Sequence, residues 1–207
     1  MISNLFLKMK KLHRKNLYSW SIFNEERNID FHSVLWIRSE GNVLIDPLPL
    51  SDHDKKHLES LGGAAHIIIT NSDHLRDASN ISEWAKAKCW GPADEKEKFP
   101  LVFKDWLKDG NEPIPGLKIF TVDGSKTPGE LSILLEEKTL ITGDLIRVHE
   151  GGRLCMLPKS KLKNYKKAVE SIKRMAEIKT IEAVLPGDGW PIFRNGHQAL
   201  IELVKQL

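Results

Sequence analysis

Three polar segments of the sequence each follow a short apolar run and carry side chains that bind cations or transfer protons. They are the loop of residues 71–77, Asp144 and Asp188. Carboxylates near a histidine can act as general acids and bases, and carboxylate oxygens are the ligands that Mg²⁺, Mn²⁺ and Ca²⁺ prefer. If the fold brings these segments together, the sequence contains the parts of a catalytic or ligand-binding site.

Each of these segments follows a predicted strand. Short runs of apolar and β-branched residues bounded by turn residues predict strands, and a continuous apolar run such as residues 65–70 predicts one that is buried on both faces. The predicted strands are Tyr18–Phe23, Phe31–Arg38, Asn42–Ile45, residues 65–70, Leu117–Val122, Leu131–Leu135, Thr139–Thr142 and Ile181–Leu185.

Capping residues and helical spacing predict the helices. Ser51 with Asp54 three residues later forms a capping box, and Gly62 with Gly63 ends the helix that it starts. Apolar residues at alternating steps of three and four predict an amphipathic helix within Ser160–Lys179. Further helices are expected at Ser79–Lys88 and from Asn195 or Gly196 to the end. Residues 91–116 contain four prolines and are expected to be an irregular packed region.

In each half of the chain, strands are followed by a helix and then by a buried strand that ends in an acidic loop. Two mixed sheets face to face with helices outside accommodate this order. The sequence therefore predicts an α/β fold, a four-layer αββα sandwich. In such layered folds ligands gather beyond the carboxyl ends of strands, so the acidic loops are expected to converge there.

Composition limits the classes of partner. The chain has 207 residues and a net charge of +3, but residues 1–16 carry five Lys or Arg and no acid, which leaves 26 basic and 28 acidic residues in 17–207. We expect a flexible basic tail at 1–16, a single domain at 17–207 and no nucleic-acid partner. No apolar run approaches a membrane span, and two cysteines without a C-x-x-C motif favour a cytoplasmic protein. The sequence leaves the oligomeric state open.

Five landmarks in this order resemble the metallo-β-lactamase superfamily, over Tyr18 to the C-terminus. The landmarks are Leu44–Asp46, Thr70–Arg76, Gly124–Gly129, Thr142–Asp144 and Pro186–Gly189. In that order they resemble the family's motifs L-I-D, T-H-x-H-x-D-H, G-H-T-P-G, T-G-D and P-G-H-G. The resemblance implies the αββα fold and the activity class of a metal-dependent hydrolase.

The metal ligands of that family are mostly replaced here. The family's usual site holds two metals with five histidines and two aspartates, and a metal-activated hydroxide attacks the substrate. An ungapped alignment puts Asn71, Asp73, Lys126 and Asp188 at histidine positions, and keeps only Asp144 unchanged. The register of residues 71–77 stays open, but no choice restores five histidines. A di-zinc site of the family type is therefore not expected.

Two hypotheses remain for the diverged site. In the first, Asp73, Asp144 and Asp188, with Asn71 or His74, hold one divalent cation, Mg²⁺, Mn²⁺ or Ca²⁺ rather than Zn²⁺, and the protein is a hydrolase of unknown substrate. The candidate catalytic residues are then Asp73, Lys126, Asp144 and Asp188, and the candidate ligand-binding residues are Asn71, His74, Arg76 and Trp190.

In the second hypothesis, Lys126 and Arg76 supply the positive charge that the metals supply in the family. Carboxylates crowded together without a cation resist ionisation, so such a site needs internal counter-charges. The protein would then be a non-catalytic relative whose salt-bridged cluster serves structure or binds a small molecule. The position of the Lys126 ammonium relative to Asp144 and Asp188 distinguishes the two hypotheses.

Overall fold

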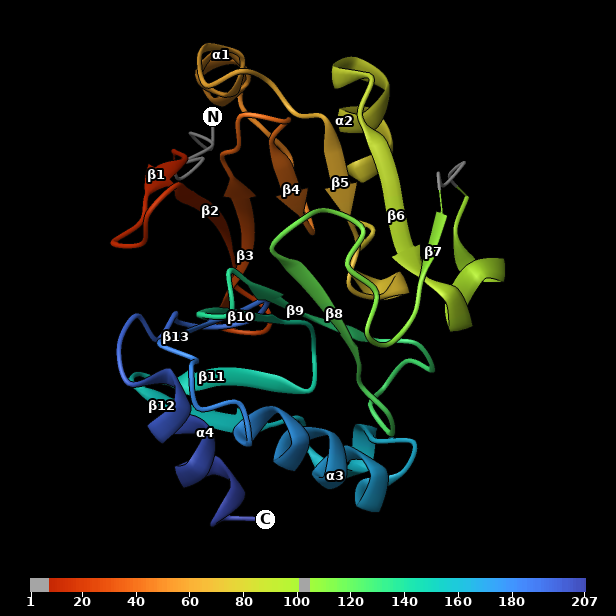
Figure 1. Ribbon diagram of the computed structural model, residues 1–207, viewed down its shortest axis with the longest axis vertical. Helices are drawn as coiled ribbons and strands as arrows, with labels where there is room; N and C mark the ends of the chain where they lie inside the picture. The colour runs from red at the N-terminus through yellow and green to blue at the C-terminus, as the bar shows by residue number, and fades with distance from the viewer. Residues whose placement is uncertain (1–7, 101–104) are drawn as a thin grey trace.

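Two β-sheets packed face to face, each covered by helices on its outer side, make up residues 8–100 and 105–207, which this computed structural model describes (Figure 1). From top to bottom in Figure 1 the layers are two helices, a seven-stranded sheet, a four-stranded sheet and two further helices. The prediction of an α/β fold with αββα layers is confirmed. None of the helices in these residues is long and apolar enough to cross a membrane.

The first sheet contains the strands of the N-terminal half in sequence order. The strands β1 to β4 pair antiparallel and β4 to β7 pair parallel, so the sheet is mixed. Helices α1 and α2 lie on its outer side. The elements are β1 (Lys10–Lys11), β2 (Leu17–Asn24), β3 (Ile29–Trp36), β4 (Val43–Ile45), α1 (Asp52–Ser60), β5 (His66–Ile68), α2 (Ala78–Ala85), β6 (Lys88–Pro92) and β7 (Asp105–Leu107).

The second sheet has the order β13-β10-β9-β8, in which only β10 and β13 pair parallel. After β10 the chain forms a separate hairpin, β11–β12, and then helix α3. Strand β13 follows α3, and helix α4 follows β13. The elements are β8 (Leu117–Thr121), β9 (Leu131–Leu135), β10 (Thr139–Thr142), β11 (Ile146–Glu150), β12 (Arg153–Met156), α3 (Tyr165–Ala176), β13 (Ala183–Pro186) and α4 (Gly196–Val204), with short 3₁₀ turns η1 (Ser72–His74), η2 (Ala93–Lys98) and η3 (Lys159–Lys161).

Three clusters of buried apolar residues fill the three spaces between the layers. Successive side chains of a strand point to opposite faces of its sheet, so a continuous apolar run serves two interfaces. Ile67 and Ile69 pack in the cluster beneath α1 and α2, whereas Ile68 packs between the two sheets. In β10, Leu140 belongs to the cluster that includes α3 and Ile141 to the one between the sheets. The apolar runs in the sequence therefore correspond to strands buried on both faces.

The structure corrects the expectation that residues 91–116 lack regular structure. The predicted helix Ser79–Lys88 ends at Ala85, because Lys86 takes a left-handed conformation with φ of 53° and closes the helix. Lys88 then starts β6, and η2 and β7 follow. Pro92 is tolerated because it ends its strand.

The segment between Asp144 and the third helix also differs from expectation. It forms the hairpin β11–β12, which the sequence analysis did not predict. The helix expected within Ser160–Lys179 is shorter, since η3 precedes it and Asn164 caps α3 by accepting a hydrogen bond from the Lys167 N–H.

Within residues 8–16, which the sequence analysis assigns to a flexible tail, some residues contact the rest of the fold. Strand β1 pairs with β2, and the Met9 side chain is only 4% exposed. The Met9 N–H donates to Asp54 Oδ1 at 2.9 Å, and Arg14 forms an ion pair of 2.7 Å with Glu182. Residues 1–7 of the expected tail lie outside the described residues.

We predict that Met9→Ala lowers the free energy of unfolding by about 2 kcal/mol or more, because it removes a buried side chain from the cluster beneath α1. Lys10→Ala, at an exposed neighbouring position, should change it by less than about 0.5 kcal/mol. Urea unfolding of both variants and the wild type measures the difference. Equal stability of all three would show that residue 9 does not contribute to the core.

Candidate functional site

The candidate site lies where the parallel strands of both sheets end. Asp46 follows β4, the loop 71–77 follows β5, Asp144 follows β10 and Asp188 follows β13. Their side chains meet around a cavity of about 210 Å³. The lining includes most of the predicted site residues and four others; it consists of Asn24, Arg27, Phe31, Leu48, Asp73, His74, Arg76, Lys126, Asp144 and Asp188.

A buried carboxylate, Asp46, fixes the orientation of His74. Its Oδ1 accepts the Thr70 N–H at 2.7 Å, and its Oδ2 accepts the Thr70 hydroxyl at 2.6 Å and lies 2.8 Å from His74 Nδ1. The other ring nitrogen, Nε2, then lies 3.9 Å from Asp144 Oδ2 and 4.0 Å from Asp188 Oδ1. His74 therefore stands between three carboxylates.

These carboxylates favour the charged form of His74. Burial and the Arg76 guanidinium oppose protonation, but Asp46 and Asp144 outweigh them and raise the pKa of His74 above its ordinary value. The ring fits because residue 187 is glycine: a Cβ there would lie 2.7 Å from His74 Cε1. The protonated imidazole is therefore favoured, and in that form His74 is a buried cation and a hydrogen-bond donor.

Lys126 bridges Asp73 and Asp144; of the two aspartates that the sequence analysis used to distinguish the hypotheses, it pairs with Asp144 and, among the described residues, not with Asp188. Its Nζ lies 2.7 Å from Asp73 Oδ2 and 3.2 Å from Asp144 Oδ2. Partial burial opposes the charge on Lys126, but these two carboxylates raise its pKa. Burial likewise opposes ionisation of Asp144, yet His74, Lys126 and Arg147 lower its pKa. Asp144 is thus held as a carboxylate by fixed cations.

Asn71 connects this ion pair to the loop after β5. Its side-chain amide donates to Asp144 Oδ2 at 3.2 Å, while its Oδ1 accepts the Asp73 N–H at 2.9 Å and caps η1. One buried side chain therefore both starts the turn that carries Asp73 and hydrogen-bonds Asp144.

Asp188 is paired with an arginine that the sequence analysis did not single out. Arg147, on β11, forms a short ion pair with Asp188 Oδ2, and Arg76 Nη2 lies 4.0 Å from Asp188 Oδ1. Arg76 also donates to the backbone carbonyls of His32, Asp46 and Gly187, which hold its guanidinium in place. The Asp188 Oδ1 atom itself is buried and has no hydrogen-bond partner within the described residues.

Two buried glutamates, also absent from the sequence-based set, support the site. Glu95 in η2 accepts the Ser72 N–H at 3.0 Å and the Gly129 N–H at 3.2 Å, and so joins the loop after β5 to the loop that carries Lys126. Glu130 accepts the Leu145 N–H at 2.9 Å and the Ser125 hydroxyl. Burial, and then the charge on Asp144, raise the pKa of Glu130 to about 7.

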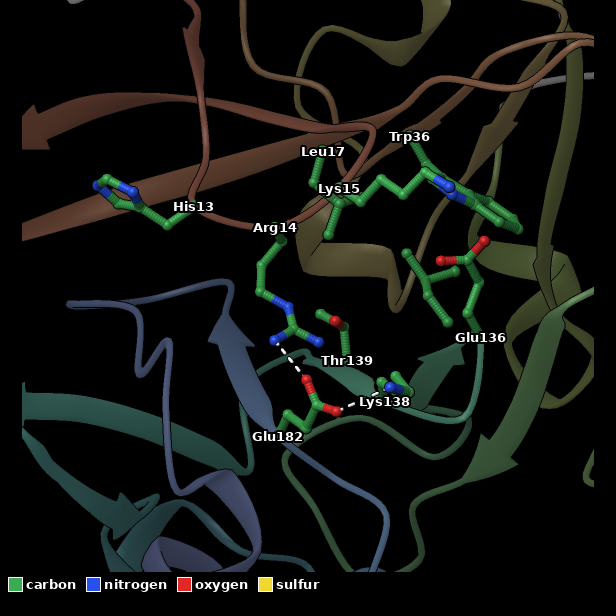
Figure 2. A pocket seen from close by; sticks show the side chains of 10 residues that line it. His13, Arg14, Lys15, Leu17, Trp36, Glu136, Lys138, Thr139 and Glu182 are labelled. Carbon is green, nitrogen blue, oxygen red and sulfur yellow. Dashed lines mark hydrogen bonds and ion pairs between the residues drawn. The ribbon is translucent and has the colours of Figure 1, made fainter.

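Trp190 does not line the cavity that contains Asp144 and Asp188. Its side chain is 66% exposed and lines a separate cavity. Another cavity, of about 400 Å³, lies at the opposite edge of the sheets, near the starts of β10 and β13. Figure 2 shows Arg14 and Lys138 both directed at Glu182 there, and none of the predicted site residues lines it.

The residues present do not fit a pair of zinc ions. Two of the positions aligned with the family's histidines hold Asn71, an amide, and Lys126, an ammonium. The Lys126 ammonium contacts the carboxylate of Asp144. The Arg147 guanidinium contacts Asp188 in the same way. Within residues 8–100 and 105–207, no group of three or more His, Cys, Asp and Glu side chains is arranged to hold a metal ion. Cations of the chain occupy the donor atoms instead.

Comparisons with known proteins agree with this fold. The family model of the Metallo-beta-lactamase superfamily matches residues 9–207. Among solved structures, the DIM-1 metallo-beta-lactamase has a TM-score of 0.74 at 15% identity, over 97% of this chain and 98% of that one. A metallo-beta-lactamase from Pontibacter korlensis has the same score and identity, over 97% and 100%, and one from Erythrobacter litoralis scores 0.70 at 10% identity, over 98% and 94%. No curated protein matches the sequence significantly.

We predict that, as the pH rises from about 4.5 to 7, the free energy of unfolding of the wild type falls relative to that of Glu130→Gln. The folded-state pKa of Glu130, about 7, lies above the 4.5 of the unfolded chain. The stabilisation by this bound proton is therefore complete below pH 4.5 and is lost as the pH rises through 7, which amounts to about 3 kcal/mol. Urea unfolding across this range measures the difference between the two proteins. A constant difference would show that folding does not raise the pKa of Glu130.

Proposed function

The chain belongs to the metallo-β-lactamase superfamily. We propose that it binds a small anion in the cavity that the ion-pair cluster lines, and that it does not hydrolyse a substrate with two metals. The observation that carries this proposal is the position of Lys126 Nζ, 2.7 Å from Asp73 and 3.2 Å from Asp144. An ammonium there repels a cation from the same carboxylates.

The carboxylates of the cluster are paired with basic side chains of the chain itself. Each carboxylate has a basic side chain within 4.0 Å, so these side chains take the place of a bound metal as its partner. The carboxylates are Asp46, Asp73, Asp144 and Asp188, and the cations are His74, Lys126, Arg147 and Arg76.

One further cation lines the cavity without such a partner. Arg27, in the turn between β2 and β3, forms no ion pair with a carboxylate of the described residues, and its guanidinium lies 5.9 Å from the Phe31 ring. A guanidinium binds carboxylate or phosphate groups through two parallel hydrogen bonds. Arg27 adds a positive charge that no carboxylate of the described residues pairs with, and the cavity therefore favours an anionic ligand.

The same contacts argue against acid–base catalysis. A general base must be able to accept a proton, but Asp46 and Asp144 raise the pKa of His74 against the effects of burial and Arg76, which favours the imidazole that already carries one. Asp144 is engaged by Lys126 and Asn71. Asp188 Oδ1 is a buried carboxylate oxygen without a hydrogen-bond partner among the described residues, and it favours the alternative, a hydrolase in which this atom orients water.

We predict that the wild-type protein, purified without chelators or metal-affinity columns, contains no stoichiometric Zn, Mn, Mg or Ca. Lys126→Ala should bind Mn²⁺ at least about tenfold more tightly than wild type, because it frees two carboxylates. Lys138→Ala, which removes an exposed lysine from the opposite edge, should bind Mn²⁺ as weakly as wild type. Elemental analysis and calorimetric titration with MnCl₂ measure these quantities.

Stoichiometric metal in the wild type, with a thermal midpoint that falls on addition of EDTA, would contradict this proposal. The single-cation hydrolase would then replace it.

The anion itself is tested with acetate and inorganic phosphate as probes. We predict that either probe raises the thermal midpoint of the wild type, that Arg27→Ala loses most of this increase, and that Arg194→Ala keeps it. Arg194 is an exposed arginine that does not line the cavity, so it controls for nonspecific binding of anions. Equal increases in all three proteins would contradict binding in the cavity.

A further inference from the structure

Two exposed aromatic side chains line one cavity outside the candidate site. Within the described residues, the exposed large apolar side chains are Phe23 at 49%, Trp84 at 38% and Trp190 at 66%. Phe23 and Trp190 both line a cavity of about 360 Å³, with Asp30 and His149. Large aromatic surface left open to water is a common feature of binding sites.

Backbone hydrogen bonds hold these residues together. Phe23 on β2 lies directly opposite Asp30 on β3, so their side chains share one face of the sheet. The Gly189 N–H donates to the Asp30 carbonyl at 2.8 Å, and the Trp190 N–H donates to the Val148 carbonyl at 3.2 Å. The four segments therefore lie side by side and carry the cavity walls.

Gly189 is required for this arrangement. It has a φ of 90°, and a Cβ at this position would lie 1.8 Å from the Val148 carbonyl oxygen. Only glycine lets the chain pass so close to β11. This close approach places Trp190 at the cavity instead of in the core.

The charge at this cavity is negative. Asp30 lines it and forms no ion pair with a cation of the described residues. Burial, and then the nearby Arg147, lower the pKa of His149, so its imidazole is neutral at pH 7. Arg147 itself is paired with Asp188. One carboxylate and two aromatic rings therefore face an occupant of the cavity, with no fixed positive charge among the lining side chains.

We propose that this cavity binds a small organic cation with an alkylated ammonium group, held by the rings of Phe23 and Trp190 and by the Asp30 carboxylate. Aromatic faces attract cations through their quadrupole, and alkyl groups on the nitrogen lower the cost of removing it from water. The site is independent of the anion cavity. The residues that line the two cavities are different, and none of them lines both.

The test compares choline with its neutral isostere, in which carbon replaces the ammonium nitrogen. The two probes have nearly the same shape and differ in charge, so a purely apolar cavity binds both. We expect choline to bind the full chain saturably and the isostere to bind roughly tenfold more weakly, as followed by saturation-transfer NMR of the probe methyl groups.

Three variants locate the binding. Asp30→Asn should weaken choline binding roughly three- to tenfold and leave the isostere unchanged, and Trp190→Leu, which keeps apolar surface but removes the ring, should weaken choline by a similar factor. Trp84→Leu is the matched control on α2 and should bind choline like the wild type. Thermal midpoints verify that all variants fold.

Equal binding of choline and the isostere would overturn the proposal, as would the absence of choline binding. A loss of binding in Trp84→Leu equal to that in Trp190→Leu would also overturn it.

Discussion

The crowding of carboxylates at one end of the two sheets is the constraint on which the arrangement of the loops depends. Four aspartates converge there, and they are paired with His74, Lys126 and Arg147, of which Lys126 serves both Asp73 and Asp144. Two residues of the cluster take unusual backbone conformations. Asp46 and Arg76 adopt left-handed conformations with φ of 47° and 45°, which non-glycine residues adopt rarely. The hydrogen bonds of their side chains and carbonyls offset that strain.

Much of the fold was predictable because strands buried on both faces leave a clear signal. The strands Leu131–Leu135 and Thr139–Thr142 were predicted with the bounds that the structure has. The missed strands lack that signal. Strand β6 has only five residues and begins just after Lys86, which closes α2. Strand β11 is interrupted by a bulge and ends in exposed residues. The pairing of β6 depends on β5 and β7, which lie elsewhere in the sequence, whereas β11 pairs with β12 directly after it.

The candidate site was predictable only in part, for a similar reason. Family-like motifs located Asp144, Asp188 and Lys126, and the chemistry of crowded carboxylates gave Lys126 its expected partner. No local pattern marks Arg147 as the partner of Asp188, because the two residues meet only when β11 packs beside β13. Glu95 lies in a run of charged residues that resembles a solvated surface, although its carboxylate joins two loops.

The last strand of the chain also completes structure formed by the first ones. The His32 N–H donates to the Gly187 carbonyl, the Gly189 N–H donates to the Asp30 carbonyl, and Arg14 is paired with Glu182, 168 positions away. Contacts between such distant segments form late, because closing a long loop costs conformational entropy. During synthesis on the ribosome, the β2–β3 hairpin can pair before residues 187–189 exist, but the His32 N–H and the Asp30 carbonyl gain their partners only when that segment has been made.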